Sequence, residues 1–159
     1  MTPNPKNPIY EYFVSKGGRI RHTKPPFWRI IKWRFPGWDF DRPAGSITAF
    51  YRTIYVKSDM LPEHLLLHEI THLDRQGWSF PGAVWFTIKF FLSPRFRLKE
   101  EIIAYRKQYG WIIRHERDPE ARTRWLNHIV KDLSGPLYGN LLTFDEARAA
   151  LPSERNTQA

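Results

Sequence analysis

The chain has 159 residues, which is enough for one domain with a sizeable hydrophobic core. It contains no cysteine, and this excludes both a disulfide framework and a thiolate metal site. The net charge of +9 favours anionic partners such as nucleic acid or an anionic surface. Because the basic residues are spread along the chain, we favour a solubilising role for this charge.

The N-terminal segment carries weak structural signals. Residues 1–9 hold three prolines and two asparagines and are expected to form a loose arm. Residues 9–14 are expected to dock as a strand or turn, and residues 19–22 as a short strand. The first residues lack the apolar stretch of a secretion signal, so we expect a cytoplasmic protein. The longest apolar run, residues 83–92, is shorter than the about 20 residues of a membrane span.

Two aromatic-rich stretches come next. Residues 27–35 interleave aromatic side chains with Arg and Lys, a pattern found at nucleic-acid stacking platforms and membrane interfaces. We favour a half-buried strand or short helix there, whose Arg and Lys stems cover apolar surface. Residues 46–57 are rich in β-branched and aromatic side chains and predict either one long strand or two strands with a kink near Arg52.

The remaining segments predict helices. The first has Pro62 in its first turn, with Asp59 or Ser58 as its cap, and residues 76–82 break the chain after it. Further helices are expected over residues 83–92, 94–113, 119–133 and 144–151, with a frayed end over residues 152–159. Together these elements predict a single α+β domain over residues 1–159, with a small, mostly antiparallel N-terminal sheet packed on the first helix and a helical C-terminal half.

The sequence H-E-x-x-H occurs at residues 68–72, inside an apolar run. His68 and His72 are four residues apart, so a helix places them one turn apart on one face. Two imidazoles at this spacing can bind one Zn²⁺. Glu69 is rotated by about 100° from His68, which places its carboxylate beside the metal as a general base. The apolar neighbours indicate a buried helix, whose polar groups need partners that a metal supplies.

A catalytic zinc site needs a third protein ligand. The carboxylates are candidates, as are the remaining histidines His22, His64, His115 and His128. The H-E-x-x-H-x-x-G-x-x-H arrangement is absent, because Arg75 and Trp78 occupy the positions of its Gly and its last His. The predicted helix over residues 94–113 offers Glu100 and Glu101, and the residues alone leave both open.

The H-E-x-x-H sequence, followed by Glu101-Ile102-Ile103-Ala104-Tyr105, resembles the gluzincin clan of metallopeptidases. The resemblance covers residues 46–110, and the chain is similar in size to minimal gluzincins and to short phage and prophage metallopeptidases. It implies a zincin-like fold in which Zn²⁺ is bound by His68, His72 and Glu101, with Glu69 as the general base.

Tyr105 departs from the gluzincin pattern, which has an Asp four residues after the ligand Glu. That Asp orients a ligand histidine, so Tyr105 or another group must do this here. The departure also leaves Glu100 as a rival ligand, although the register with Ala104 and Tyr105 favours Glu101.

The resemblance implies a zinc-dependent metallopeptidase acting on a peptide or protein substrate. Glu69 would take a proton from the attacking water and give it to the leaving amine. The oxyanion needs a further donor, for which the candidates are Tyr105, Tyr109, Tyr138, His64 and His115. The strand before the helix would offer a free edge for pairing with an extended substrate.

Two other functions are compatible with the composition. The chain could be a non-catalytic binding or structural protein on a zincin scaffold, including a virion protein of a phage, with a basic aromatic surface for nucleic acid, an envelope or a protein. It could also be a peptidase tethered to DNA, for which salt-dependent DNA binding is the test. The sequence does not predict the oligomeric state.

Overall fold

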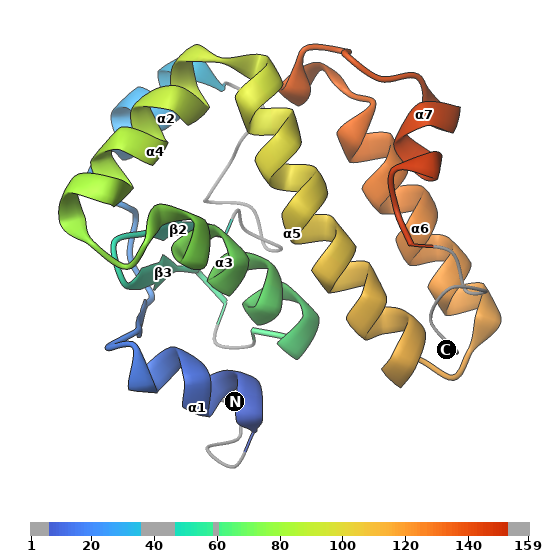
Figure 1. Ribbon diagram of the computed structural model, residues 1–159, viewed down its shortest axis with the longest axis horizontal. Helices are drawn as coiled ribbons and strands as arrows, with labels where there is room; N and C mark the ends of the chain where they lie inside the picture. The colour runs from blue at the N-terminus through green and yellow to red at the C-terminus, as the bar shows by residue number, and fades with distance from the viewer. Residues whose placement is uncertain (1–6, 36–46, 59–60, 153–159) are drawn as a thin grey trace.

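The computed structural model describes residues 7–35, 47–58 and 61–152. Within these residues it is an α+β structure, mostly helical, with a small three-stranded sheet (Figure 1). In chain order the elements are α1 (Pro8–Ser15), β1 (Arg19–Arg21), α2 (Trp28–Arg34), β2 (Thr48–Phe50), β3 (Thr53–Tyr55), α3 (Glu63–Gln76), α4 (Phe80–Leu92), α5 (Pro94–His115), α6 (Pro119–Leu133), the 3₁₀ helix η1 (Pro136–Tyr138) and α7 (Phe144–Ala149). The long helix α5 runs through the middle, with α3 and the sheet on one side and α6 and α7 on the other.

The N-terminal segment differs from the prediction. Residues 9–14 belong to helix α1 rather than to a strand or turn. The side chain of Asn7 caps this helix by accepting a hydrogen bond from the amide of Ile9, and Pro8 occupies the first turn. The expected loose arm is therefore helical from Pro8 onward, while residues 1–6 lie outside the described residues, as do residues 153–159 of the predicted frayed end.

The sheet has β3 in its centre. β1 pairs with β3 in parallel and β2 pairs with it antiparallel, so the sheet is mixed and the prediction of a mostly antiparallel sheet is wrong. β1 can run parallel to β3 because the chain between them passes through α2 and β2 before it returns. The predicted strand at residues 19–22 is confirmed as β1, and residues 27–35 form the short helix α2.

Residues 46–57 contain a reversal near Arg52 rather than a kink. β2 and β3 form a hairpin whose two loop residues, Tyr51 and Arg52, have positive φ angles of 36° and 59°. Such a two-residue loop usually contains Gly or Asn. Here contacts from elsewhere in the chain support it, because Arg52 Nε donates to the carbonyl of Trp78 over 3.0 Å.

Helix α3 begins at Glu63, with Pro62 as its N-cap and no capping bond from a side chain. The N-cap is therefore Pro62, which was predicted in the first turn, rather than the predicted Ser58; the other predicted cap, Asp59, lies outside the described residues. The helix ends at Gly77, whose φ of 74° suits glycine. Gly82 then allows α4 to start close to α3, because a Cβ on Gly82 would collide with the carbonyl oxygen of Gln76.

The C-terminal helices follow their capping signals. Helices α5, α6 and α7 begin after the caps Ser93, Asp118 and Thr143, each of which accepts a backbone hydrogen bond. The capping box of Thr143 and Glu146 is present in full. These helices confirm the predicted segments to within a few residues.

Two hydrophobic clusters flank the junction between α3 and α5. One joins α1, the sheet and α3 through Phe13, Ile54, Leu66, Ile70 and Leu73. The other joins α5 to the C-terminal helices through Ile112, Ile129, Val130, Leu133 and Ala147. Because α3 packs along α5, the polar faces of these two helices meet between the clusters.

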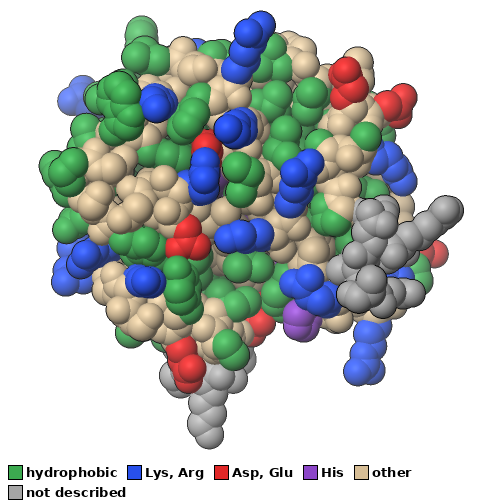
Figure 2. Space-filling view, viewed as in Figure 1, with side chains coloured by type: hydrophobic (Ala, Val, Ile, Leu, Met, Phe, Trp, Pro, Cys, Tyr) green, Lys and Arg blue, Asp and Glu red, His purple; other side chains and the backbone are tan. Residues whose placement is uncertain are grey.

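Helices α2 and α4 lie at the same end of the molecule, where Phe35 stacks on Phe91 at 5.5 Å between ring centroids. Their outer faces expose Trp33 (79%), Trp85 (60%) and Leu92 (78%). Figure 2 shows cationic side chains scattered among hydrophobic ones on one face of the molecule. In the described part of the chain, no helix has the length and apolar character to cross a membrane.

Candidate metal centre

Helix α3 directs three polar side chains away from the sheet cluster. Leu66, Ile70 and Leu73 pack into that cluster and fix the rotation of the helix. His68, Glu69 and His72 are each only 7% exposed, although all three are polar. Buried polar groups require hydrogen-bond or ion partners, and α5 provides the first of them.

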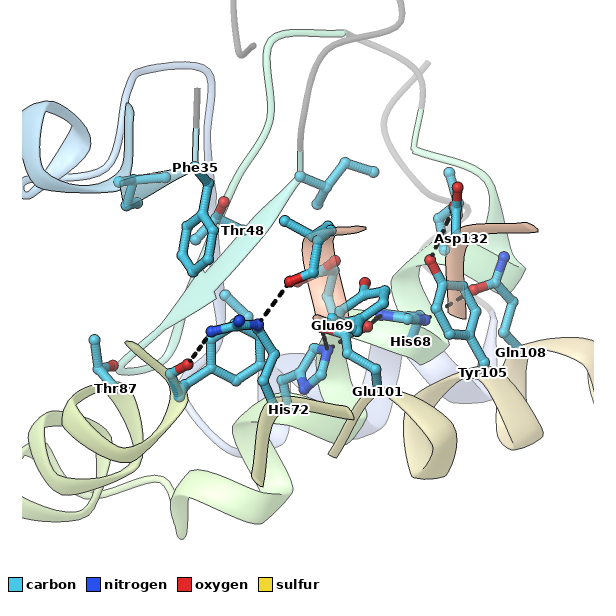
Figure 3. A pocket seen from close by; sticks show the side chains of 18 of the residues that line it. Phe35, Thr48, His68, Glu69, His72, Thr87, Glu101, Tyr105, Gln108 and Asp132 are labelled. Carbon is cyan, nitrogen blue, oxygen red and sulfur yellow. Dashed lines mark hydrogen bonds and ion pairs between the residues drawn. The ribbon is translucent and has the colours of Figure 1, made fainter. Parts of the chain in front are cut away.

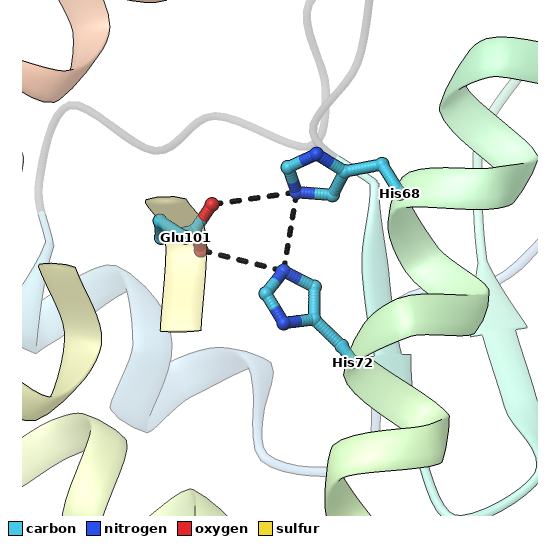
Figure 4. A group of neighbouring side chains, drawn as sticks. All are labelled: His68, His72 and Glu101. Carbon is cyan, nitrogen blue, oxygen red and sulfur yellow. Dashed lines mark hydrogen bonds and ion pairs between the residues drawn. The ribbon is translucent and has the colours of Figure 1, made fainter. Parts of the chain in front are cut away.

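Glu101 of α5 reaches both histidines (Figure 4). Its two carboxylate oxygens lie 3.3 Å from His68 Nε2 and 3.5 Å from His72 Nε2, and the two Nε2 atoms are 3.1 Å apart. Burial opposes ionisation of Glu101, but the charge of His72 and hydrogen bonds from both histidines hold its pKa well below the ordinary range. The carboxylate is therefore kept in the ionised form that a metal requires.

The distances between these three ligand atoms fit tetrahedral coordination of one metal ion. Ligands at about 2.0–2.2 Å from Zn²⁺ stand about 3.3–3.6 Å from one another in a tetrahedron. The distances of 3.1, 3.3 and 3.5 Å between the donor atoms are close to this range. The described residues thus contain a buried group, His68, His72 and Glu101, that could hold a metal ion.

Gln108 supports this group and was missed by the sequence analysis. Its side-chain oxygen lies 2.8 Å from His68 Nδ1, and Gln108 is 2% exposed (Figure 3). An amide oxygen only accepts, so Nδ1 is the nitrogen that donates to Gln108, and Nε2 is the nitrogen that faces Glu101 and would face a metal. Gln108 follows Glu101 by seven residues, which is two turns along the same face of α5 and the signal that could have identified it.

The Nδ1 atoms of the two histidines differ in their hydrogen bonding. His72 Nδ1 is buried, and within the described part of the chain it has no hydrogen-bond partner. The rings of Phe86 and Phe90 of α4 pack around this imidazole instead, at 6.3 and 6.2 Å between ring centroids. Helix α4 therefore covers the group, as expected from its apolar sequence.

Glu69 lies beside the three donors without joining them. Burial raises the pKa of Glu69 from 4.5 to about 7; the charge of His68 opposes this rise and that of Glu101 adds to it. A carboxyl group with a pKa near neutrality can both accept and return a proton at physiological pH. This is the property required of the predicted general base.

Tyr105 does not take over the role of the missing Asp. Its ring packs edge-on against His68, with 4.6 Å between ring centroids, and its hydroxyl donates to Asp132 over 3.3 Å. Burial, together with the charges of Glu101 and Asp132, raises the pKa of Tyr105 well above 10, so the hydroxyl stays protonated. Tyr138 is hydrogen-bonded to Tyr105, and its pKa is raised in the same way, first by burial.

The other predicted oxyanion donors lie elsewhere. Tyr109 belongs to the C-terminal core cluster. His64 packs between Trp111 and Trp125, and His115 stacks on Trp111 at the end of α5. Of the five candidates, only Tyr105 and Tyr138 line the pocket beside the donor group.

Glu100, the rival ligand, points away from the histidines. Both of its oxygens accept hydrogen bonds from Arg75, at 2.7 Å from Nε and 2.9 Å from Nη2. Such a bidentate pair occupies the carboxylate fully. The structure therefore brings Glu101, and not Glu100, to the histidine pair.

The donor group opens into a pocket of about 490 Å³. One wall is the edge strand β2, at Thr48 and Ala49, and another is built from aromatic rings of α4 and of Phe27 and Phe35, the residues that flank α2. Part of the strand edge is already in use, because Gln76 donates to the carbonyl of Ala49 and accepts from the amide of Tyr51. An extended ligand can therefore pair with β2 only outside the segment that Gln76 covers.

No protein-family model matches this chain, and neither a curated protein nor a solved structure matches it. The interpretation of the site therefore depends on its own geometry.

Proposed function

We propose that this protein is a zinc-dependent metallopeptidase with a zincin-like site similar to that of gluzincins. The observation that carries the proposal is the meeting of His68, His72 and Glu101 at tetrahedral ligand spacing, beside Glu69 and a pocket. Two nitrogen donors and one carboxylate oxygen form a ligand set typical of catalytic zinc.

His68, His72 and Glu101 would hold the ion, and Gln108 would fix the orientation of His68. When bound, zinc supplies Lewis-acid polarisation of a carbonyl and lowers the pKa of water towards about 7. Glu69 takes the proton of the attacking water and delivers it to the leaving amine. The protonated hydroxyl of Tyr105 lines the same pocket, and by turning its proton from Asp132 it would donate to the developing oxyanion.

The direct test combines metal analysis with hydrolysis. We expect mass spectrometry of the purified protein to find close to one zinc per chain. We also expect the zinc-loaded protein to cleave an unfolded generic substrate, and a chelator to stop the cleavage. Hydrolysis that is unchanged by complete removal of the metal would contradict the proposal.

The variant Glu69→Gln separates metal binding from chemistry. The amide has nearly the same shape but cannot accept the proton, so we expect zinc to stay bound and hydrolysis to fall by at least about 100-fold. Glu63→Gln, in the first turn of the same helix, is the matched control and should keep full activity. Wild-type hydrolysis by the Glu69→Gln variant would remove Glu69 from the mechanism.

A second candidate function is non-catalytic binding to an anionic surface. Trp33, Trp85 and Leu92 are exposed, and no Asp or Glu occurs from Arg75 to Lys99. Aromatic and cationic side chains together favour attachment to an anionic bilayer. Sedimentation with vesicles containing 30% phosphatidylserine, compared with neutral vesicles and with DNA at several salt concentrations, tests this function independently of zinc.

A further inference from the structure

Arg97 is a cation buried in the wall of the pocket. It lies on α5 one helical turn before Glu101, is 2% exposed, and lines the pocket together with Glu101 and the two histidines. Neighbouring arginines differ from it: Arg95 of α5 is exposed, and Arg75 of α3 is paired with Glu100.

The surroundings of Arg97 hold its guanidinium in place without a bonded carboxylate, although the charge of Glu101 acts on it from one helical turn away. Nε donates to the carbonyl of Leu137 over 3.0 Å and Nη1 to the carbonyl of Phe90 over 2.6 Å. The rings of Phe35 and Phe90 lie 4.7 and 5.7 Å from the guanidinium carbon. Within the described part of the chain, two of the five N–H donors are thus engaged.

No carboxylate of residues 7–35, 47–58 or 61–152 forms an ion pair with Arg97. A buried charge without a counter-ion is costly, and breaking the pairing of a buried charge is among the more destabilising changes in proteins. Arg97 stays protonated in proteins even when buried. The pocket therefore contains a fixed, aromatic-walled cation that no carboxylate of the described residues bonds, and its remaining N–H groups have no hydrogen-bond partner among those residues.

We propose that Arg97 binds a carboxylate of the substrate, so that the pocket selects short peptides that carry a carboxylate close to the bond to be cleaved. This inference deepens the proposed peptidase function and rests on it. The guanidinium has the planar geometry that carboxylates match, and the aromatic walls strengthen such hydrogen bonds by excluding water. The carboxylate can be the C-terminus of the peptide or an acidic side chain.

The pocket volume supports a short substrate. About 490 Å³ lies within the range of about 300–1,000 Å³ that encloses small ligands. The rings against Arg97 are Phe35 and Phe90, and the pocket lining also includes the apolar side chains of Ile31, Phe86 and Phe91. We therefore expect a bulky apolar side chain beside the carboxylate.

The test measures binding rather than turnover. The zinc-loaded Glu69→Gln protein is titrated by calorimetry with three peptides of the sequence Ala-Ala-Phe-Leu: the free acid, the amide, and an amide in which Asp replaces the last residue. We expect the free acid to bind about 10–100-fold more tightly than the plain amide, as a charge-assisted hydrogen bond predicts. The Asp peptide shows whether a side-chain carboxylate is accepted as well. Equal affinity for all three peptides would overturn the proposal.

Variants at Arg97 then test whether this residue causes the tighter binding of the free-acid peptide. Arg97→Gln should abolish the preference for the free acid, Arg97→Lys should keep part of it, and Arg95→Gln should leave it unchanged. A preference that survives in a folded Arg97→Gln protein would rule out Arg97 as its source. If Arg97→Gln does not fold, the Arg97→Lys variant and the comparison of the three peptides on the parent protein still show whether Arg97 causes the preference for the free acid.

The same set of peptides keeps the two proposals apart. A preference for carboxylates in a protein that hydrolyses none of the peptides would contradict the peptidase function and leave Arg97 as a carboxylate site. Hydrolysis of acid and amide at equal rates, with equal binding, would support the peptidase function and contradict the role of Arg97.

Discussion

His68 donates a hydrogen bond from Nδ1 to the side-chain oxygen of Gln108 over 2.8 Å, across the interface between α3 and α5. A neutral amide therefore orients the first histidine of the H-E-x-x-H sequence. A carboxylate in this position would increase the basicity of the imidazole, whereas an amide fixes the ring with a smaller electrostatic effect. If the group holds a metal, its affinity for the metal would depend on this contact.

Replacing Gln108 with Leu should weaken metal binding without removing a ligand. The imidazole of His68 loses the partner that fixes its tautomer, and we expect the dissociation constant for zinc to rise about 10–100-fold. Gln108→Glu should restore tight binding, since its carboxylate also accepts from Nδ1. Competition with a chromogenic chelator measures both values, and an unchanged constant for the Leu variant would show that Gln108 does not position His68.

The two neighbouring glutamates of α5 should behave differently when changed to Gln. Glu101→Gln should abolish metal binding, because Glu101 is the only carboxylate that contacts both histidines among the described residues. Glu100→Gln should keep the metal and lower the free energy of unfolding by about 1–2 kcal/mol through its weaker bond to Arg75. Metal content and urea denaturation test both expectations; loss of metal from the Glu100 variant alone would reverse the assignment.

Tyr105→Phe tests the donor role of the hydroxyl. We expect kcat to fall about 100–1,000-fold with little change in KM or in zinc content, as for the loss of one oxyanion donor. Tyr12→Phe is the control, because the hydroxyl of Tyr12 binds Asp74 on the exposed surface. A fall in zinc content would instead indicate that Tyr105 acts by packing against His68.

The metal-free protein should lose stability between pH 4.5 and 7 because of Glu69. Burial raises the pKa of this carboxyl to about 7 in the folded chain, against 4.5 when unfolded. Between these two pH values the Glu69 carboxyl is protonated in the folded chain and ionised in the unfolded chain. The free energy of unfolding is therefore highest below pH 4.5 and falls as the pH rises through 7. A shift of this size corresponds to about 3 kcal/mol.

Glu69→Gln should remove this dependence. In the presence of a chelator, the variant should match the native chain near pH 4.5 and exceed its stability near pH 8. Lowering of the pKa of His64, mainly by burial, acts in the opposite direction below pH 6.5 but is common to both proteins and cancels in the comparison. Equal stability of the two proteins at pH 8 would show that the Glu69 carboxyl is not penalised by burial.

The sequence predicts the local features of the site well. The spacing of His68 and His72 is a property of any α-helix, and the caps at Ser93 and Asp118 mark helix starts through short-range hydrogen bonds. These signals need no knowledge of the rest of the fold. The helices that carry the donors could therefore be located from the residues alone.

Features that depend on contacts between distant elements could not be located in this way. Gln108 becomes a partner of His68 only through the packing of α3 on α5, and the reversal at Tyr51 and Arg52 is supported by Trp78. The parallel pairing of β1 with β3 depends on the path of the chain through α2. The start of α1 is an exception, because the Asn7-Pro8 pair is a capping signal that the sequence contains.

The donor group lies where the two hydrophobic clusters meet. His68 and His72 belong to a helix anchored in the sheet, whereas Glu101 belongs to a helix anchored in the C-terminal cluster. An ion bound there would tie the two halves of the molecule together, so its binding energy would add to the energy that keeps them docked. The concentration of available zinc would then determine how resistant the folded chain is to proteolysis, in addition to the rate of the proposed hydrolysis.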